Sequence, residues 1–66
     1  MTLKEFMDMD YGGITDWEVS HFDGSDVKKF RGEGVYDLDL QNREVFGFGI
    51  SLGEHDSAVI CTVAVK

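Results

Sequence analysis

The sequence contains no proline and a single cysteine. Without proline, every residue after the first can donate a backbone hydrogen bond, so no segment is excluded from the interior of a β-sheet. Because Cys61 is the only cysteine, disulfide bonds within the chain are excluded, and a lone thiol fits a reducing compartment. We therefore expect Cys61 to behave as a small buried hydrophobe and the protein to be cytoplasmic.

Long apolar runs are also missing. No stretch approaches the roughly eighteen apolar residues that span a bilayer, and the acidic start "MTLKEFMDMD" has no targeting pattern. We expect no membrane contact and one domain over residues 1–66. A chain of this length buries only about 60% of the surface that its unfolded form exposes, so its hydrophobic core is small. Domains of this size are often stabilised by self-association.

Basic residues are scarce. Thirteen Asp and Glu oppose six Lys and Arg, giving a formal charge of −7. Direct binding to nucleic acid usually needs the opposite sign, and only "VKKFR" is locally basic. The charge favours a partner with a basic surface, although acidity can also serve solubility alone.

The order of predicted elements defines the fold class. Thr2 followed by Glu5 forms a capping box, which predicts a short N-terminal helix that stops at the "YGG" of residues 11–13. From Ile14 onward the apolar period is two, and strands are predicted at 14–22, 27–31, 35–40, 44–52 and 58–66. This order predicts an α+β fold, with the helix packed on one face of a four- to five-stranded antiparallel sheet.

The glycine-rich stretch "VFGFGISLG" is interpreted as a strand. A dinucleotide fingerprint needs a third glycine where Leu52 stands and a following helix, and no phosphate-binding Gly-Lys-Ser/Thr is present, so no cofactor is predicted. Alternation predicts one set of side chains that faces the helix and forms the core: Phe46, Phe48, Ile50 and Leu52, with Val59, Cys61, Val63 and Val65 on the next strand.

Large and charged side chains are nearly absent from the other face of these two strands. A solvated face normally carries long polar side chains, whereas this one carries Gly47, Gly49, Ser51, Ile60, Thr62 and Ala64. Glycine in a strand often marks the close approach of another backbone. We expect a homo-oligomer, most simply a two-fold dimer, joined through this face or the adjacent edge. The alternative is a bent or bulged sheet that needs its glycines.

Pairs of acids lie two residues apart on predicted strands, and they are Asp16, Glu18, Asp37 and Asp39. Such pairs project from one face roughly 6.6 Å apart. Rows of carboxylates can occupy a protein groove that normally holds nucleic-acid phosphates. The alternative is a solvated face balanced by Lys28, Lys29 and Arg31 on neighbouring strands.

Catalytic and metal-binding patterns are weak. His55 lies between Glu54 and Asp56, but a metal site needs three or four converging ligands, and a tight turn aims neighbours apart. Ser20 and His21 would project to opposite faces of one strand, so they cannot form a catalytic pair. The sequence predicts no metal site, no catalytic residue and no enzyme.

The segments "MTLKEFM", "WEVSHFD" and "AVICTVAVK" follow one another in an order that resembles small accessory proteins of phages and mobile elements of Gram-positive bacteria. Some such proteins inhibit host defence systems, including CRISPR nucleases, and some resemble the PC4-like fold and oligomerise. The resemblance implies an inhibitor or modulator of a host nucleic-acid-handling protein, such as a CRISPR effector, with the acidic pairs contacting a basic groove. The alternative is a PC4-like oligomer that binds nucleic acid directly through Lys28, Lys29 and Arg31.

Overall fold

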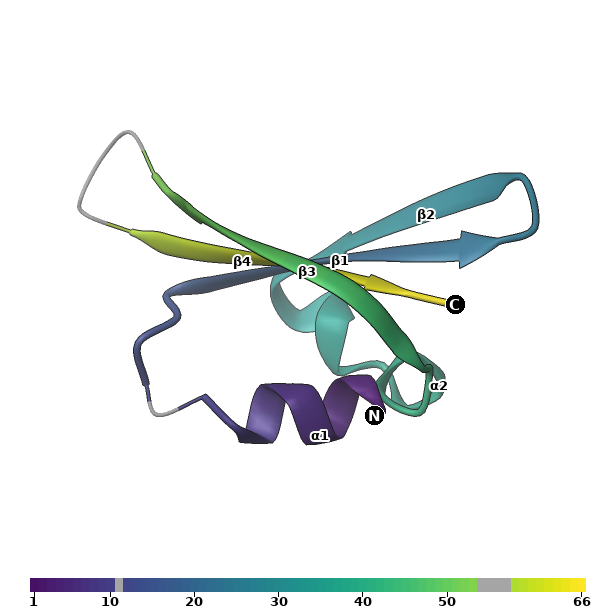
Figure 1. Ribbon diagram of the computed structural model, residues 1–66, viewed down its shortest axis with the longest axis horizontal. Helices are drawn as coiled ribbons and strands as arrows, with labels where there is room; N and C mark the ends of the chain where they lie inside the picture. Colours follow the sequence, from purple (N-terminus) through teal and green to yellow (C-terminus); the bar gives the residue numbers. More distant parts are fainter. Residues whose placement is uncertain (11, 54–57) are drawn as a thin grey trace.

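The fold is a four-stranded sheet with one face covered by short helices (Figure 1). A computed structural model describes residues 1–10, 12–53 and 58–66. The elements follow one another as α1 (Leu3–Asp8), β1 (Asp16–Asp23), β2 (Asp26–Arg31), the 3₁₀ helix η1 (Gly32–Tyr36), α2 (Leu38–Gln41), β3 (Val45–Leu52) and β4 (Val59–Val65). The α+β class and the short N-terminal helix are as predicted.

Helix α1 begins with the predicted capping box. The Glu5 backbone N–H donates to the Thr2 hydroxyl over 3.2 Å, and the Thr2 backbone N–H donates to the Glu5 carboxylate over 3.0 Å. Hydrogen bonds from the backbone and side chain of Thr2 hold the pKa of Glu5 below its ordinary value. After the helix, the Asp10 carboxylate accepts from the Gly12 and Gly13 N–H groups, and Gly12 has φ of +91°. The helix therefore ends because of interactions within its own segment, the Asp10 hydrogen bonds and the left-handed backbone of Gly12.

The sheet is mixed and not wholly antiparallel, with strand order β2-β1-β4-β3. The hairpins β1–β2 and β3–β4 are antiparallel, but β1 and β4 pair in parallel, with Val19 beside Val63. The reason is the connection from β2 to β3, which crosses the covered face from one edge of the sheet to the other. The second hairpin then returns β4 alongside β1.

The prediction of a strand over residues 35–40 is wrong. The chain there forms η1 and α2, and they supply the crossing connection. Gly32, at φ of +55°, ends β2, and the Asp37 carboxylate accepts from the Leu40 N–H to cap α2. Helical geometry buries both Val35 and Leu40, which a strand would have placed on opposite faces.

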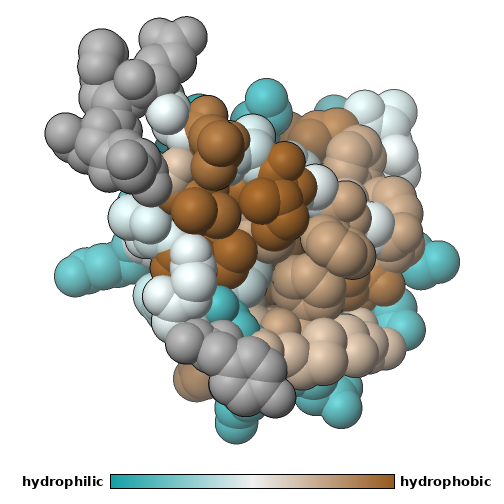
Figure 2. Space-filling view, turned by 60° about the vertical axis from the view of Figure 1, so that its left-hand side comes forward, coloured by the Kyte–Doolittle hydropathy of each residue, from teal (hydrophilic) through white to brown (hydrophobic). Residues whose placement is uncertain are grey.

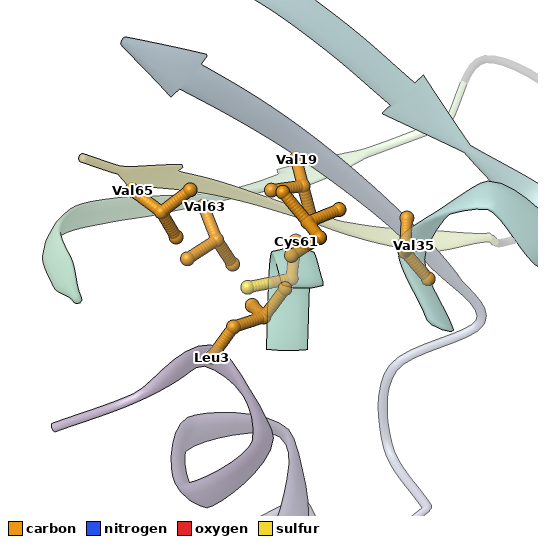
Figure 3. Close-up of a cluster of buried hydrophobic side chains, with 7 residues drawn as sticks. Leu3, Val19, Val35, Cys61, Val63 and Val65 are labelled. Carbon is orange, nitrogen blue, oxygen red and sulfur yellow. The ribbon is translucent and has the colours of Figure 1, made fainter. Parts of the chain in front are cut away.

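The core lies between the sheet and the helices (Figure 3). Alternation along β4 buries three of the four side chains predicted for the core, Cys61, Val63 and Val65, whereas Val59 at the start of the strand is only partly buried. Leu3 from α1 and Val19 from β1 complete the centre, and both are at most 1% exposed. Burial raises the pKa of the Cys61 thiol, with a smaller contribution from the charge of Asp10.

Strand β3 forms as predicted, but its large side chains do not form the core. Phe46, Phe48, Ile50 and Leu52 are 52%, 63%, 55% and 76% exposed. Helix α1 starts beside β3, because the Val45 N–H donates to the Met1 carbonyl over 2.8 Å. With six residues the helix is about 9 Å long, whereas the eight-residue strand extends about 27 Å, so α1 cannot cover it.

A β-bulge between Val45 and Gly47 changes the direction of Phe46. Its ring meets Phe22 of β1 with centroids 5.3 Å apart, on the sheet face opposite the helices. Phe48 stays on the helix side, where its ring lies 5.0 Å from that of Phe6. The predicted single row of four side chains is therefore split by the bulge.

Candidate interaction surfaces

The sheet face turned away from the helices is the first candidate surface, and we call it the open face. No segment of the described ranges lies over it (Figure 1). Register and alternation place there Asp16, Glu18, Ser20 and Phe22 of β1, Val27, Lys29 and Arg31 of β2, Ile60, Thr62 and Ala64 of β4, and Gly47, Gly49 and Ser51 of β3. The β-bulge adds Phe46, whose ring packs against Phe22.

The six small residues predicted for self-association lie together on the open face. They form three adjacent cross-strand pairs, Gly47 with Ala64, Gly49 with Thr62 and Ser51 with Ile60. Neither Gly47 nor Gly49 has a positive φ, and a Cβ atom at either position would meet nothing within 4 Å. Packing within the chain therefore does not require these glycines. Their part in self-association stays a prediction.

Asp16 and Glu18 share the open face as predicted, but their electrostatic environments differ. The Glu18 carboxylate lies 3.1 Å from Nε of Arg31, its cross-strand partner on β2. Asp16 is exposed and stands beside Ile60. The three charged side chains line a depression of about 240 Å³, together with Trp17, Gly32 and Ile60.

The second predicted acidic pair is not a strand pair. Asp37 caps α2, and Asp39 on that helix bonds Arg43 over 3.0 Å, one turn further along. Because α2 lies on the covered side of the sheet, these carboxylates form no row with Asp16 and Glu18. This segment forms a helix and not a strand because the Asp37 cap and the Asp39–Arg43 ion pair both stabilise helical geometry within the segment itself.

Replacing Asp37 by alanine should lower the free energy of unfolding by about 0.5–2 kcal/mol, because the Leu40 N–H loses its capping oxygen. Urea denaturation would measure the change. Asp16→Ala is the matched control, since Asp16 is exposed and makes no described ion pair. Equal losses for the two variants would contradict the capping role.

The basic residues do not form one patch. Lys28 pairs with His21 on the helix side of the sheet, whereas Lys29 and Arg31 pair with Ser20 and Glu18 on the open face. The Arg31 guanidinium is already bound to Glu18. The alternative nucleic-acid contacts are therefore divided between two faces.

Residue types associated with catalysis do not converge in the described ranges. Ser20 and His21 follow each other on β1 and project to opposite faces, as predicted. His55, Glu54 and Asp56 lie outside the described residues. Within the described part of the chain, no three His, Cys, Asp or Glu side chains are grouped closely enough to hold a metal ion.

An apolar cavity at the end of α1 was not predicted from the sequence. It has a volume of about 190 Å³ and is lined by Phe6, Met9, Asp10, Ile14, Trp17, Ile50 and Cys61. Figure 2 views the molecule from this end, where apolar side chains gather at the surface. The lengths of the predicted elements could have indicated the cavity, because a helix of two turns cannot cover a strand of eight residues and leaves apolar side chains of that strand uncovered.

Comparisons with known proteins identify no relative. No family model matches the chain, and neither the curated proteins nor the solved structures contain a significant match. In the residues that the structure describes, no helix is both long enough and apolar enough to cross a membrane.

Proposed function

We propose that this protein acts by binding, and that it inhibits or modulates a nucleic-acid-handling protein of its host, such as a CRISPR effector. Its carboxylates would occupy a basic groove that otherwise holds phosphates. The contact surface we favour is the β1–β2 hairpin, whose acids Asp16, Glu18, Asp23 and Asp26 lie at the two ends of β1 and at the turn.

The observation that carries the proposal is the distribution of ion pairs. Both arginines are engaged within the chain, Arg31 with Glu18 and Arg43 with Asp39. Among the described residues, no Lys or Arg lies within ion-pair distance of Asp16, Asp23 or Asp26, and all three are exposed. The chain thus neutralises its arginines internally and presents its excess carboxylates outward, which favours a basic partner.

The hairpin turn brings two of these carboxylates together. Asp23 and Asp26 are directly opposed across the β1–β2 pair. Like charges in that arrangement destabilise an isolated hairpin, so a cation brought by a partner would relieve a repulsion already present. Direct binding of nucleic acid is less favoured, because Lys28 projects away from Lys29 and Arg31 is engaged.

Affinity capture tests the proposal. The immobilised protein is exposed to nuclease-treated extract of a Gram-positive bacterium at low salt, washed, and eluted at about 1 M salt, where the Debye length falls to about 3 Å. We expect a nucleic-acid-binding protein in the eluate, and its capture should be blocked by added nucleic acid. Capture that resists salt, or that added nucleic acid leaves unchanged, would contradict the proposal.

A further inference from the structure

The two edge strands of the sheet differ in how they are protected. Strand β2 carries Asp26, Lys28, Lys29 and Arg31 within six residues, and charged edges discourage pairing with other chains. Strand β3, the opposite edge, has eight residues without a charge or a proline. Of the two edges, only β3 is suited to accept another strand.

The outward-facing backbone groups of β3 can be assigned from one hydrogen bond. The Gly53 N–H donates to the Ala58 carbonyl over 2.7 Å, which makes Gly53 and Ala58 a hydrogen-bonded pair of the β3–β4 ladder. Bonded and non-bonded pairs alternate in an antiparallel ladder. The N–H and C=O groups of Leu52, Ile50 and Phe48 therefore point away from β4, toward the open edge.

The same three residues carry the exposed apolar side chains on the helix side, at 76%, 55% and 63% exposure. Phe48 touches Phe6, and Ile50 also lines the 190 Å³ cavity beside Trp17. With Met9, which is 49% exposed, these side chains offer several hundred Å² of apolar surface. That is a substantial share of the roughly 800 Å² that each partner buries in a stable interface.

We propose that a second copy of this chain pairs antiparallel with β3 along this edge, around a two-fold axis at Ile50. Ile50 then faces Ile50 of the second copy, and Phe48 faces Leu52 of the second copy, so all three outward backbone pairs are satisfied. The two sheets form one continuous eight-stranded sheet. The absence of charge from β3 allows this contact between two chains that each carry −7.

This edge pairing is independent of the proposed function and differs from packing through the small residues of the open face. A strand edge gives backbone hydrogen bonds, and the exposed row beside it gives apolar contact. The second copy is favoured over an unrelated peptide because the two-fold arrangement matches each large side chain with another apolar one. It also covers apolar surface on both chains at once.

Sedimentation velocity with variants tests the pairing. Wild type should sediment as a dimer at micromolar concentration, and Leu52→Lys should shift it to monomer, because a lysine would meet the apolar row of the second copy. The matched control is Val27→Lys on β2, 46% exposed, which should remain dimeric. A wild-type monomer at these concentrations, or a dimer that survives Leu52→Lys, would overturn the proposal.

Cysteine cross-linking tests the register. The variant combines Ile50→Cys with Cys61→Ala, because Cys61 lies directly opposite position 50 on β4 and would otherwise compete for a disulfide within the chain. The two cysteines at position 50, as hydrogen-bonded partners across the axis, would have Cα atoms about 5.5 Å apart, within the range of a disulfide. Mild oxidation should convert this variant to a covalent dimer, whereas wild type, whose Cys61 is 1% exposed, should stay uncross-linked. A dimer that is lost in Thr62→Lys but retained in Leu52→Lys would place the contact on the open face and refute edge pairing.

Discussion

Replacing Leu3 by alanine should lower the free energy of unfolding by about 2–5 kcal/mol, the usual range for a buried leucine. Leu3 is 0% exposed and packs in the centre of the core, and its N–H donates to the Arg43 carbonyl over 2.9 Å. A domain of 66 residues has roughly 3–10 kcal/mol in total. The loss is therefore large enough to unfold much of the population.

The matched control for this variant is Leu38→Ala. Leu38 is 82% exposed, so its truncation should change the stability by no more than about 0.5 kcal/mol. Urea denaturation followed by the fluorescence of Trp17, which packs against the core, measures both. Similar losses at the two leucines would show that the arrangement of α1 and α2 is wrong.

Reversing two charges on the β1–β2 hairpin should weaken binding to the captured partner at low salt by about 0.8–4 kcal/mol, which is roughly fourfold or more. The variant is Asp16→Lys with Asp26→Lys, because both side chains are exposed and make no described ion pair. Each reversal replaces an attraction by a repulsion of similar size, about 0.2–1 kcal/mol for an exposed charge pair. The variant should stay folded, since the lysine that replaces Asp26 would oppose the carboxylate of Asp23 favourably.

The control variant changes the net charge by the same amount, but its two substitutions lie on the covered side of the sheet. It combines Asp8→Lys on α1 with Glu33→Lys on η1, both exposed positions without a described ion pair. Binding to the captured partner, measured by titration at low salt, should fall much less than for the hairpin variant. An equal loss would mean that net charge alone governs binding, and a greater loss would move the contact to the helices.

Local signals in the sequence predicted the local elements. The Thr2–Glu5 capping box located α1, and the period-two patterns located β1, β3 and β4. Residues 35–40 were misassigned because "VYDLDL" alternates like a strand, while its aspartates are equally suited to cap and support a helix. Once that segment becomes a crossing connection, the parallel pairing of β1 with β4 follows.

The sequence predicted the candidate surfaces where the alternation of side chains along a strand is enough to determine which residues share a face. The six small residues share a face because strand period is two, whichever strands are neighbours. The exposure of Phe48 and Leu52 was not predicted, since it depends on where α1 is anchored and how far it reaches. The Glu18–Arg31 pair depends on the hairpin register, which a turn of uncertain length does not define.

Competition with nucleic acid is the most direct measurement of the central claim, that exposed carboxylates occupy a groove built for phosphates. A labelled nucleic acid is bound to the captured partner, and its fluorescence anisotropy is followed as the protein is added. We predict that anisotropy falls to the value of free nucleic acid, with the hairpin variant at least about fourfold less effective. An anisotropy that rises as the protein joins the bound nucleic acid in a ternary complex would contradict the claim.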